Sequence, residues 1–296
     1  MRQSRLWGPA GVCQRGFRGS PVVMADNAVH GAVQAATHSR GFELAARAGY
    51  SVSGVLHLLI AYIIVGLAFG SAGNADQSGA LATLRDQPAG AVALWLTAAG
   101  LVALALWRVA EAVLGSHPSE AGQEHGGAYD VFDRIKSAAL AVVYAGIALA
   151  AVRFANGGGQ SNSAQNAGLT ARLLQTGWGK SVLLIAAAAI VGVGGYHVYK
   201  GLSTKFEEDL TVAGGGPLIT PLGIAGYTAK GVVLGGAGIL LVVATLTADP
   251  AKGAGLDVAV KSLGQAPFGK ALLVTAAIGF AAYGAFCFVL ARFARM

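Results

Sequence analysis

The sequence predicts an all-α, polytopic membrane protein with six transmembrane helices, arranged as three repeated helical hairpins around a pseudo-threefold axis. Three observations lead to this fold class. First, 54% of the 296 residues are hydrophobic and only 12% are charged, whereas a soluble domain carries about 25% charged residues. Second, six long apolar segments follow one another along the chain. Third, glycine and aromatic residues recur in these segments at a nearly constant spacing.

Residues 1–48 contain no segment long enough to cross a bilayer, and we expect them to form a cytoplasmic tail. The first 23 residues hold four arginines and no acid, and they lack the apolar core of a secretory signal peptide. Two interpretations remain open for them, a transit peptide or a translation start at Met24, and we favour the start at Met24. Residues 27–48 are then expected to form a short amphipathic helix at the membrane surface.

Each apolar segment is long enough to cross the hydrocarbon core as a helix. The segments contain 19 to 25 residues, and about 20 helical residues span a core of about 30 Å. A single stretch of this length satisfies its backbone hydrogen bonds in lipid only as a helix. The predicted spans of the three hairpins are residues 49–70 and 89–110, 137–155 and 180–199, and 223–247 and 268–292.

The three hairpins are copies of one two-helix unit, which we place at residues 49–112, 130–202 and 223–293. The second span of each copy opens with a glycine, at spacings of 89 and 90 residues: Gly90, Gly179 and Gly269. Because each unit has two spans, all copies enter the membrane from the same side, which implies a pseudo-symmetry axis along the membrane normal. The outer loops are expected to hold short amphipathic helices that lie on the bilayer, with Trp178 and Phe268 as interface anchors.

The distribution of lysine and arginine predicts the orientation. Fourteen of the 21 cations, Lys230 among them, fall on the side that holds both termini. A start at Met24 would leave ten on that side against seven on the other. Because cytoplasmic loops carry the excess of positive charge, we expect both termini in the cytoplasm.

Two motifs resemble those of a bacterial membrane-protein family. One is Gly-Tyr followed by glycine in a first span, and the other is L-x-x-L-x-x-x-P-x-G before a second span. Their residues here are Gly49, Tyr50 and Gly54, and Leu81, Leu84, Pro88 and Gly90. The chain is thus similar, over residues 45–293, to the domain-of-unknown-function family twelve-oh-six, which is built of tandem two-helix repeats. The second repeat departs from the motif, since Gly177 replaces proline. The resemblance implies a multi-pass protein of the bacterial inner membrane and supplies no activity or catalytic residue.

His57 is the titratable side chain of the first span. An ionisable group inside the membrane is a functional hypothesis by default, and Tyr50, Ser53 and His57 share one helical face. The functional alternatives are a proton relay, a ligand contact or an axial haem ligand. We favour a neutral histidine that is hydrogen-bonded between helices, because the third repeat has Leu234 at this position and no symmetric histidine ring exists.

His197 and Lys200 lie late in the fourth span and are expected to anchor it at the cytoplasmic interface. A haem held by both histidines is disfavoured, because His197 is predicted about one turn nearer the cytoplasm than His57. Arg108 and Glu111 can pair on one face of the second span, either as a gate or as a pair that only neutralises itself. A further hypothesis groups Arg108, Lys200 and Lys230 around an anionic lipid headgroup.

These features predict no catalytic, cofactor-binding or metal-binding residue. The acidic loop with His117 and Glu120 matches no metal motif, and nucleotide-binding and hydrolase motifs are absent from the sequence. We therefore expect a non-enzymatic structural or accessory membrane subunit. Its expected partners are the lipid bilayer and another membrane protein or further copies of itself, and not nucleic acid. The alternative is a small-solute or ion permease with a path along the pseudo-symmetry axis.

Overall fold

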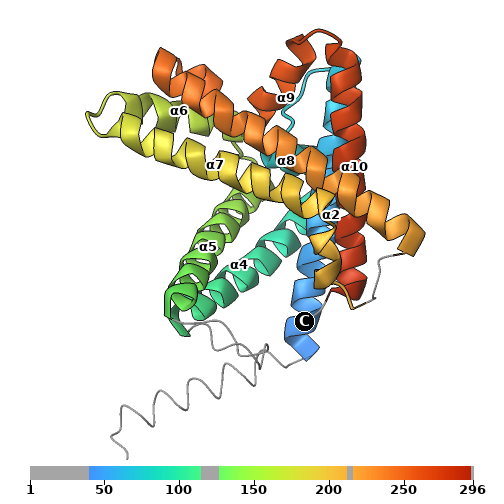
Figure 1. Ribbon diagram of the computed structural model, residues 1–296. Helices are drawn as coiled ribbons and strands as arrows, with labels where there is room; N and C mark the ends of the chain where they lie inside the picture. Colours follow the sequence, from blue (N-terminus) through green and yellow to red (C-terminus); the bar gives the residue numbers. More distant parts are fainter. Residues whose placement is uncertain (1–39, 115–126, 212–215, 295–296) are drawn as a thin grey trace, which may run out of the picture. The chain divides into compact units, whose positions relative to one another are not determined.

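The computed structural model describes residues 40–114, 127–211 and 216–294, which form nine α-helices, two 3-10 helices and no strand (Figure 1). The long helices are α2 (Arg40–Ala68), α4 (Gly90–Leu114), α5 (Gly127–Ala155), α7 (Gly179–Leu202), α8 (Gly216–Thr247) and α10 (Gly269–Phe293). The short ones are α3 (Gln77–Arg85), α6 (Asn162–Leu174) and α9 (Leu256–Gln265), with the 3-10 helices η1 (Lys205–Asp209) and η2 (Pro250–Gly253). Residues 1–39 of the predicted N-terminal tail, the acidic loop with His117 and Glu120, and the side chain of Glu111 lie outside the described residues.

The prediction of an all-helical, apolar chain is confirmed for the described residues. Five helices, α2, α5, α7, α8 and α10, are long and apolar enough to cross a membrane. Helix α4 is 25 residues long, and its segment Gly90–Leu106 is also apolar. The predicted short helix in each outer loop is present as α3, α6 and α9.

The first helix of each repeat begins earlier than predicted. Helices α2, α5 and α8 start at Arg40, Gly127 and Gly216, seven to ten residues before the predicted spans. Residues 40–48 were expected to belong to a separate surface helix, and this expectation is wrong because they continue α2 without a break. Their polar side chains hide the extension from a hydropathy reading, since hydropathy marks the apolar part of a helix and not its ends.

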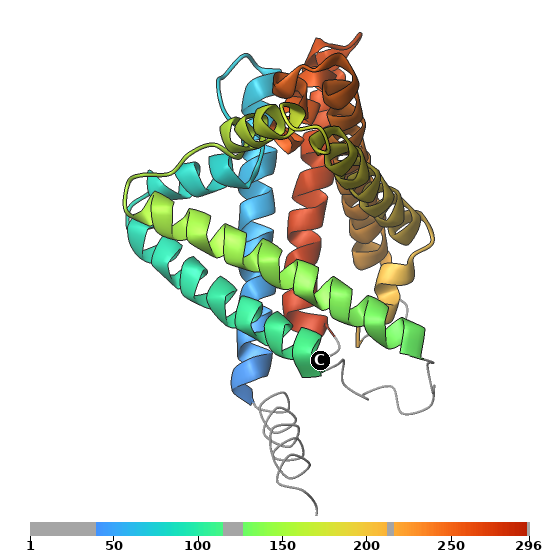
Figure 2. The same cartoon turned by 90° about the vertical axis from the view of Figure 1, so that its left-hand side faces the viewer.

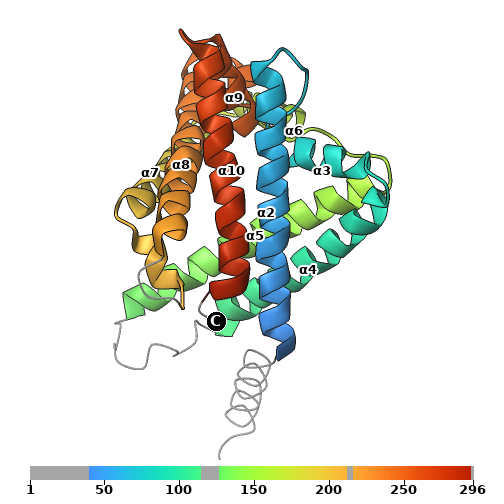
Figure 3. The ribbon, with the colours of Figure 1, turned by 90° about the vertical axis from the view of Figure 1, so that its right-hand side faces the viewer.

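The long helices pack most closely between repeats. Helix α2 packs against α10, α4 against α5, and α7 against α8, and α8 also contacts α10. Figure 3 shows α2 beside α10, and Figure 2 shows α4 alongside α5. In each of the three closest pairs, the second helix of one repeat lies on the first helix of another.

Glycines allow two of these pairs to approach closely. A Cβ atom at Gly54 of α2 would lie 3.0 Å from the carbonyl oxygen of Gly284 in α10. A Cβ at Gly194 of α7 would lie 2.8 Å from the carbonyl oxygen of Gly231 in α8. Both second helices use the glycine fifteen residues after the one that opens the helix. The hydrophobic effect does not favour the association of two helices in lipid. Small residues at such contacts let the backbones pack closely, and this packing stabilises the pair.

The glycines that open the second helices have a common structural cause. A Cβ at Gly90 would lie 2.1 Å from the Leu84 carbonyl oxygen, and one at Gly179 would lie 1.7 Å from that of Leu173. At Gly269 the corresponding distance, to the Gly264 carbonyl oxygen, is 2.0 Å. In each repeat the end of the short loop helix therefore abuts the start of the second long helix so closely that no side chain fits.

Hydrogen bonds to Asp257 join the short helices of the three repeats. Its Oδ1 accepts a hydrogen bond from the Ala75 amide at 2.8 Å, and its Oδ2 accepts one from the Ser163 hydroxyl at 3.2 Å. Asp257 is 2% exposed, and Lys261 neutralises it at 2.7 Å. The Ser78 hydroxyl accepts a further bond from the Asn162 amide at 3.0 Å. This outer clamp ties the loops before α3, α6 and α9 together.

Candidate functional site

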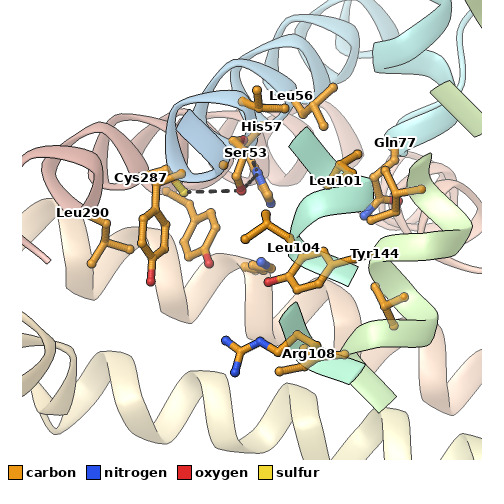
Figure 4. A pocket seen from close by; sticks show the side chains of 18 residues that line it. Ser53, Leu56, His57, Gln77, Leu101, Leu104, Arg108, Tyr144, Cys287 and Leu290 are labelled. Atoms are coloured by element: carbon orange, nitrogen blue, oxygen red, sulfur yellow. Dashed lines mark hydrogen bonds between the residues drawn. The ribbon is translucent and has the colours of Figure 1, made fainter. Parts of the chain in front are cut away.

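A cavity of about 440 Å³ lies between α2, α4, α5 and α10, with single residues contributed by α3 and α8. Its lining combines leucine, isoleucine and valine side chains with several polar groups. Figure 4 shows Arg108 and Tyr144 reaching toward the cavity from α4 and α5, opposite Ser53, His57 and Cys287 on α2 and α10. The cavity thus collects residues from all three repeats.

Helix α2 contributes the three residues that the sequence placed on one helical face. Tyr50, Ser53 and His57 all line the cavity. His57 is 8% exposed, and its Nδ1–H donates a hydrogen bond to the Ser53 carbonyl oxygen at 2.7 Å. The Ser53 hydroxyl oxygen lies 3.4 Å from the same nitrogen and 3.7 Å from the Cys287 sulfur (Figure 4).

The hydrogen bond of His57 corrects one expectation. The sequence interpretation placed the bond between helices, but its partner is the carbonyl of the preceding turn of the same helix. Contact between helices comes from ring packing, since the imidazole centroid lies 4.7 Å from the Tyr283 ring and 6.1 Å from the Phe280 ring of α10. With Nδ1 as donor, the neutral imidazole keeps Nε2 as an acceptor.

Lys230 and Arg108 bring positive charge to the cavity. Lys230 lies near the middle of the 32-residue helix α8, whereas the sequence interpretation counted it with the cations on the side of the termini. Its ammonium lies 4.0 Å from the centroid of the Tyr283 ring, a cation–π contact. No Asp or Glu of the described residues lines the cavity.

The sequence analysis predicted two groupings of charged residues, one of Arg108 with Lys200 and Lys230 and the other of Arg108 with Glu111. Lys200 does not join Arg108 and Lys230 at the cavity, because its ammonium forms an ion pair with Asp209 and lies over the Tyr227 ring. The pairing of Arg108 with Glu111 stays a prediction, since the Glu111 side chain is not described.

The structure does not bring His197 to the cavity. Its Nδ1–H donates a hydrogen bond to the Val193 carbonyl oxygen of its own helix at 2.8 Å. A row of ring contacts runs from His57 to Tyr283 at 4.7 Å, on to Tyr227 at 5.2 Å, and then to His197 at 5.9 Å. Two tyrosine rings in this row therefore lie between the histidines.

Sequence reasoning missed Tyr144, Tyr283, Cys287 and Gln77 as cavity residues. Each lies on a helix other than that of His57, and no local motif marks these residues. One available signal was Lys230, since a lysine within an apolar span is costly and marks a site. It was counted with the cations on the side of the termini, although the predicted span 223–247 already contained it.

Long apolar helices that pack through glycines around an internal polar cavity define a multi-pass helical membrane protein. The chain belongs to the family described as Domain of Unknown Function (DUF1206), whose profile matches residues 48–115, 135–204 and 225–294. The predicted resemblance to a family of three tandem repeats is confirmed. The chain is also similar to the uncharacterized protein YxxB of Bacillus subtilis (strain 168), with 27% identity over 243 residues, which is 80% of this chain and 86% of the relative. No solved structure matches the chain.

Proposed function

We propose that this chain is a non-enzymatic permease, in which a small solute passes through the cavity between α2, α4, α5 and α10. The observation that carries the proposal is a space of about 440 Å³ between long apolar helices, whose lining includes several polar side chains. Ligand sites commonly have volumes of about 300–1,000 Å³. Polar and ionisable residues inside transmembrane segments are costly and mark substrate pathways.

The proposal includes six spans and a pseudo-threefold arrangement. Helix α4 has 25 residues and is therefore about 37 Å long, which exceeds the hydrocarbon core of about 30 Å. The cyclic order of the closest helix pairs, α4 with α5, α7 with α8 and α10 with α2, supports a ring of three repeats. A path near the axis of such a ring would draw its lining from every repeat, as this cavity does.

We further propose that the protein resides in the bacterial inner membrane with both termini in the cytoplasm. The excess of Lys and Arg on the side of the termini supports this orientation. The lipid bilayer is the proposed partner of the exposed apolar helix faces, and nucleic acid is not a partner.

The permease proposal is tested with purified protein in liposomes of neutral lipid. Flux is measured for small solutes of each charge type: glycerol, benzenesulfonate and choline. Leu104→Trp places a large side chain in the cavity, and we expect it to reduce flux to the level of empty liposomes. Leu106→Trp is the matched control, since Leu106 is 65% exposed on the same helix and does not line this cavity. If wild-type protein passes no solute of the panel, or if both variants behave alike, the proposal is wrong.

A structural or accessory role is the second candidate, and a groove between α4 and α5 favours it. This groove has a volume of about 490 Å³, and its lining is wholly apolar, with Val102, Leu106, Val142 and Leu149 among its residues. A transmembrane helix of another protein or of a second copy would fit such a surface. Cross-linking from Leu106→Cys in native membranes tests this role, and a protein that stays monomeric and captures no partner would rule it out.

A further inference from the structure

Lys230 holds a charge inside the helical body of the protein without a carboxylate partner in the part of the chain that is described. It is partly buried near the middle of α8, and no described Asp or Glu oxygen lies within the 4.0 Å of an ion pair. Its contact is the face of Tyr283, at 4.0 Å. Charged groups at this depth normally pair with an opposite charge or line a watered path.

The cavity that Lys230 lines includes further groups able to donate hydrogen bonds. Arg108 adds a second positive charge to the cavity, and the phenols of Tyr50, Tyr144 and Tyr283 add hydroxyl groups. The contact with the Tyr283 ring holds the ammonium by its charge, so its N–H groups remain able to donate elsewhere. Charge-assisted hydrogen bonds from such donors to anionic oxygen are among the strongest in proteins.

The remaining lining is apolar and sets the second requirement on a ligand. Leu101 and Leu104 of α4 and Leu140 and Ile147 of α5 occupy the walls. An inorganic anion would accept hydrogen bonds from the donors, but the apolar walls would remain in contact with the water around it. A ligand with an apolar body would cover them and gain from burial.

We infer that this cavity binds an anionic oxygen group (a carboxylate, phosphate or sulfonate) carried on a small apolar body. The inference rests on the proposed function, because it names the class of solute that the path would take. The anionic group lies against the ammonium of Lys230, and the apolar body lies against the leucine and isoleucine walls. The same chemistry could come from a free organic anion or from the headgroup region of an anionic lipid.

The test uses the full chain in nanodiscs of phosphatidylcholine, with benzenesulfonate as the probe and binding measured by calorimetry. We expect wild-type protein to bind benzenesulfonate but not benzenesulfonamide, its neutral analogue. Lys230→Met should raise the Kd about tenfold or more, because it removes a charge-assisted donor, whereas Lys230→Arg should keep most of the affinity. Lys200→Met is the matched control, since Lys200 also lies over a tyrosine ring but pairs with Asp209 away from the cavity. It should leave the Kd within about twofold of wild type.

A second arm separates the two sources of the anion. In nanodiscs that contain phosphatidylglycerol, a lipid occupant would weaken benzenesulfonate binding and would be retained by wild-type protein, but not by Lys230→Met, in native mass spectrometry. Unchanged benzenesulfonate affinity in these nanodiscs would assign the site to a free anion. Either result supports the site.

Two results would overturn the inference. One is a wild-type protein that binds neither benzenesulfonate nor phosphatidylglycerol, and the other is equal binding by wild type and a folded Lys230→Met variant. Failure of the permease proposal can be distinguished from failure of the anion site. If glycerol flux persists without anion binding, the anion site is wrong and the path stands; if benzenesulfonate binds but no solute crosses, the site stands and the path is wrong.

Discussion

His57 is fixed by its own helix more than by its neighbours. Its Nδ1–H is bonded to the Ser53 carbonyl, and its ring packs against Phe280 and Tyr283. The third repeat carries Leu234 at the corresponding position, so an apolar side chain of similar size suits the repeat framework. This setting makes the imidazole a group whose chemistry can be removed without removing its packing.

Replacing His57 by leucine should leave the protein folded. The variant loses one side-chain hydrogen bond, and its partner, the Ser53 carbonyl, still accepts the helical backbone bond, so we expect the unfolding free energy to change by no more than about 1 kcal/mol. Phe280→Ala is the comparison, because Phe280 is 1% exposed and its truncation should cost about 3–5 kcal/mol. Detergent unfolding followed by circular dichroism measures both. Loss of folding in His57→Leu would show that the imidazole has a structural partner that the described residues lack.

The glycines that open the second helices should tolerate no side chain. In Gly269→Ala the new Cβ would lie 2.0 Å from the Gly264 carbonyl oxygen, and relieving this overlap should cost about 1–3 kcal/mol or more. Gly236→Ala in α8 is the matched control, since nothing lies within 4 Å of its Cβ position. There alanine should stabilise the helix by up to about 1 kcal/mol. Thermal unfolding of the two variants decides the point, and equal melting temperatures would contradict it.

At the scale of elements, the outer clamp fixes how the loop helices meet. Asp257 of α9 bonds to the loop before α3 and to Ser163 of α6, so one carboxylate holds parts of all three repeats. The bond from the Ala75 amide is buried, and removing its acceptor leaves that amide without its partner. The loss of a surface ion pair costs less, because water solvates the charge that remains.

Asp257→Ala should therefore destabilise the protein by about 1–3 kcal/mol, the cost of an unsatisfied buried donor. Asp249→Ala removes an exposed carboxylate that pairs with Lys252 at 3.6 Å and accepts an exposed hydrogen bond from the Ala251 amide at 3.2 Å. We expect a change of about 1 kcal/mol or less, because water can replace both partners. Limited proteolysis of the outer loops and thermal unfolding report both effects. If the outer clamp does not contribute to stability, Asp257→Ala and Asp249→Ala will be equally stable.

The ends of the elements show what hydropathy can predict. The second helices were predicted to begin at residues 89, 180 and 268, and they begin at Gly90, Gly179 and Gly269. The prediction succeeds because the repeated glycine is itself the cause of the boundary, where the loop helix abuts the long one. The first helices have no such signal. Their extensions beyond the predicted segments carry charged residues in α2 and α5 and two prolines in α8.

At the scale of the molecule, the pairing of helices could not be predicted from the sequence. Hydropathy suggests that the two helices of a hairpin are neighbours, whereas the closest pairs join different repeats. The pairing depends on where glycine faces glycine, and Gly54 and Gly284 are more than two hundred residues apart in the sequence. For the same reason the cavity could be predicted only in part, as Tyr50, Ser53 and His57 on α2 and as the grouping of Arg108 with Lys230. The tyrosines and cations of the other helices reach it through packing, which no motif describes.

The orientation of the molecule gives the last prediction, which follows from the repeat architecture. Because each repeat is proposed to cross the membrane twice, the loops that hold α3, α6 and α9 must share one side, and η1 must lie on the other. Single cysteines at Gly158 and Glu208, both exposed in the structure, are placed in a background with Cys13→Ser and Cys287→Ser. In intact spheroplasts a membrane-impermeant maleimide should label Gly158→Cys and not Glu208→Cys, whereas both should react after permeabilisation. Labelling of Glu208→Cys alone would place the termini outside, and labelling of both in intact spheroplasts would contradict the proposal that one span, α7, separates the two positions.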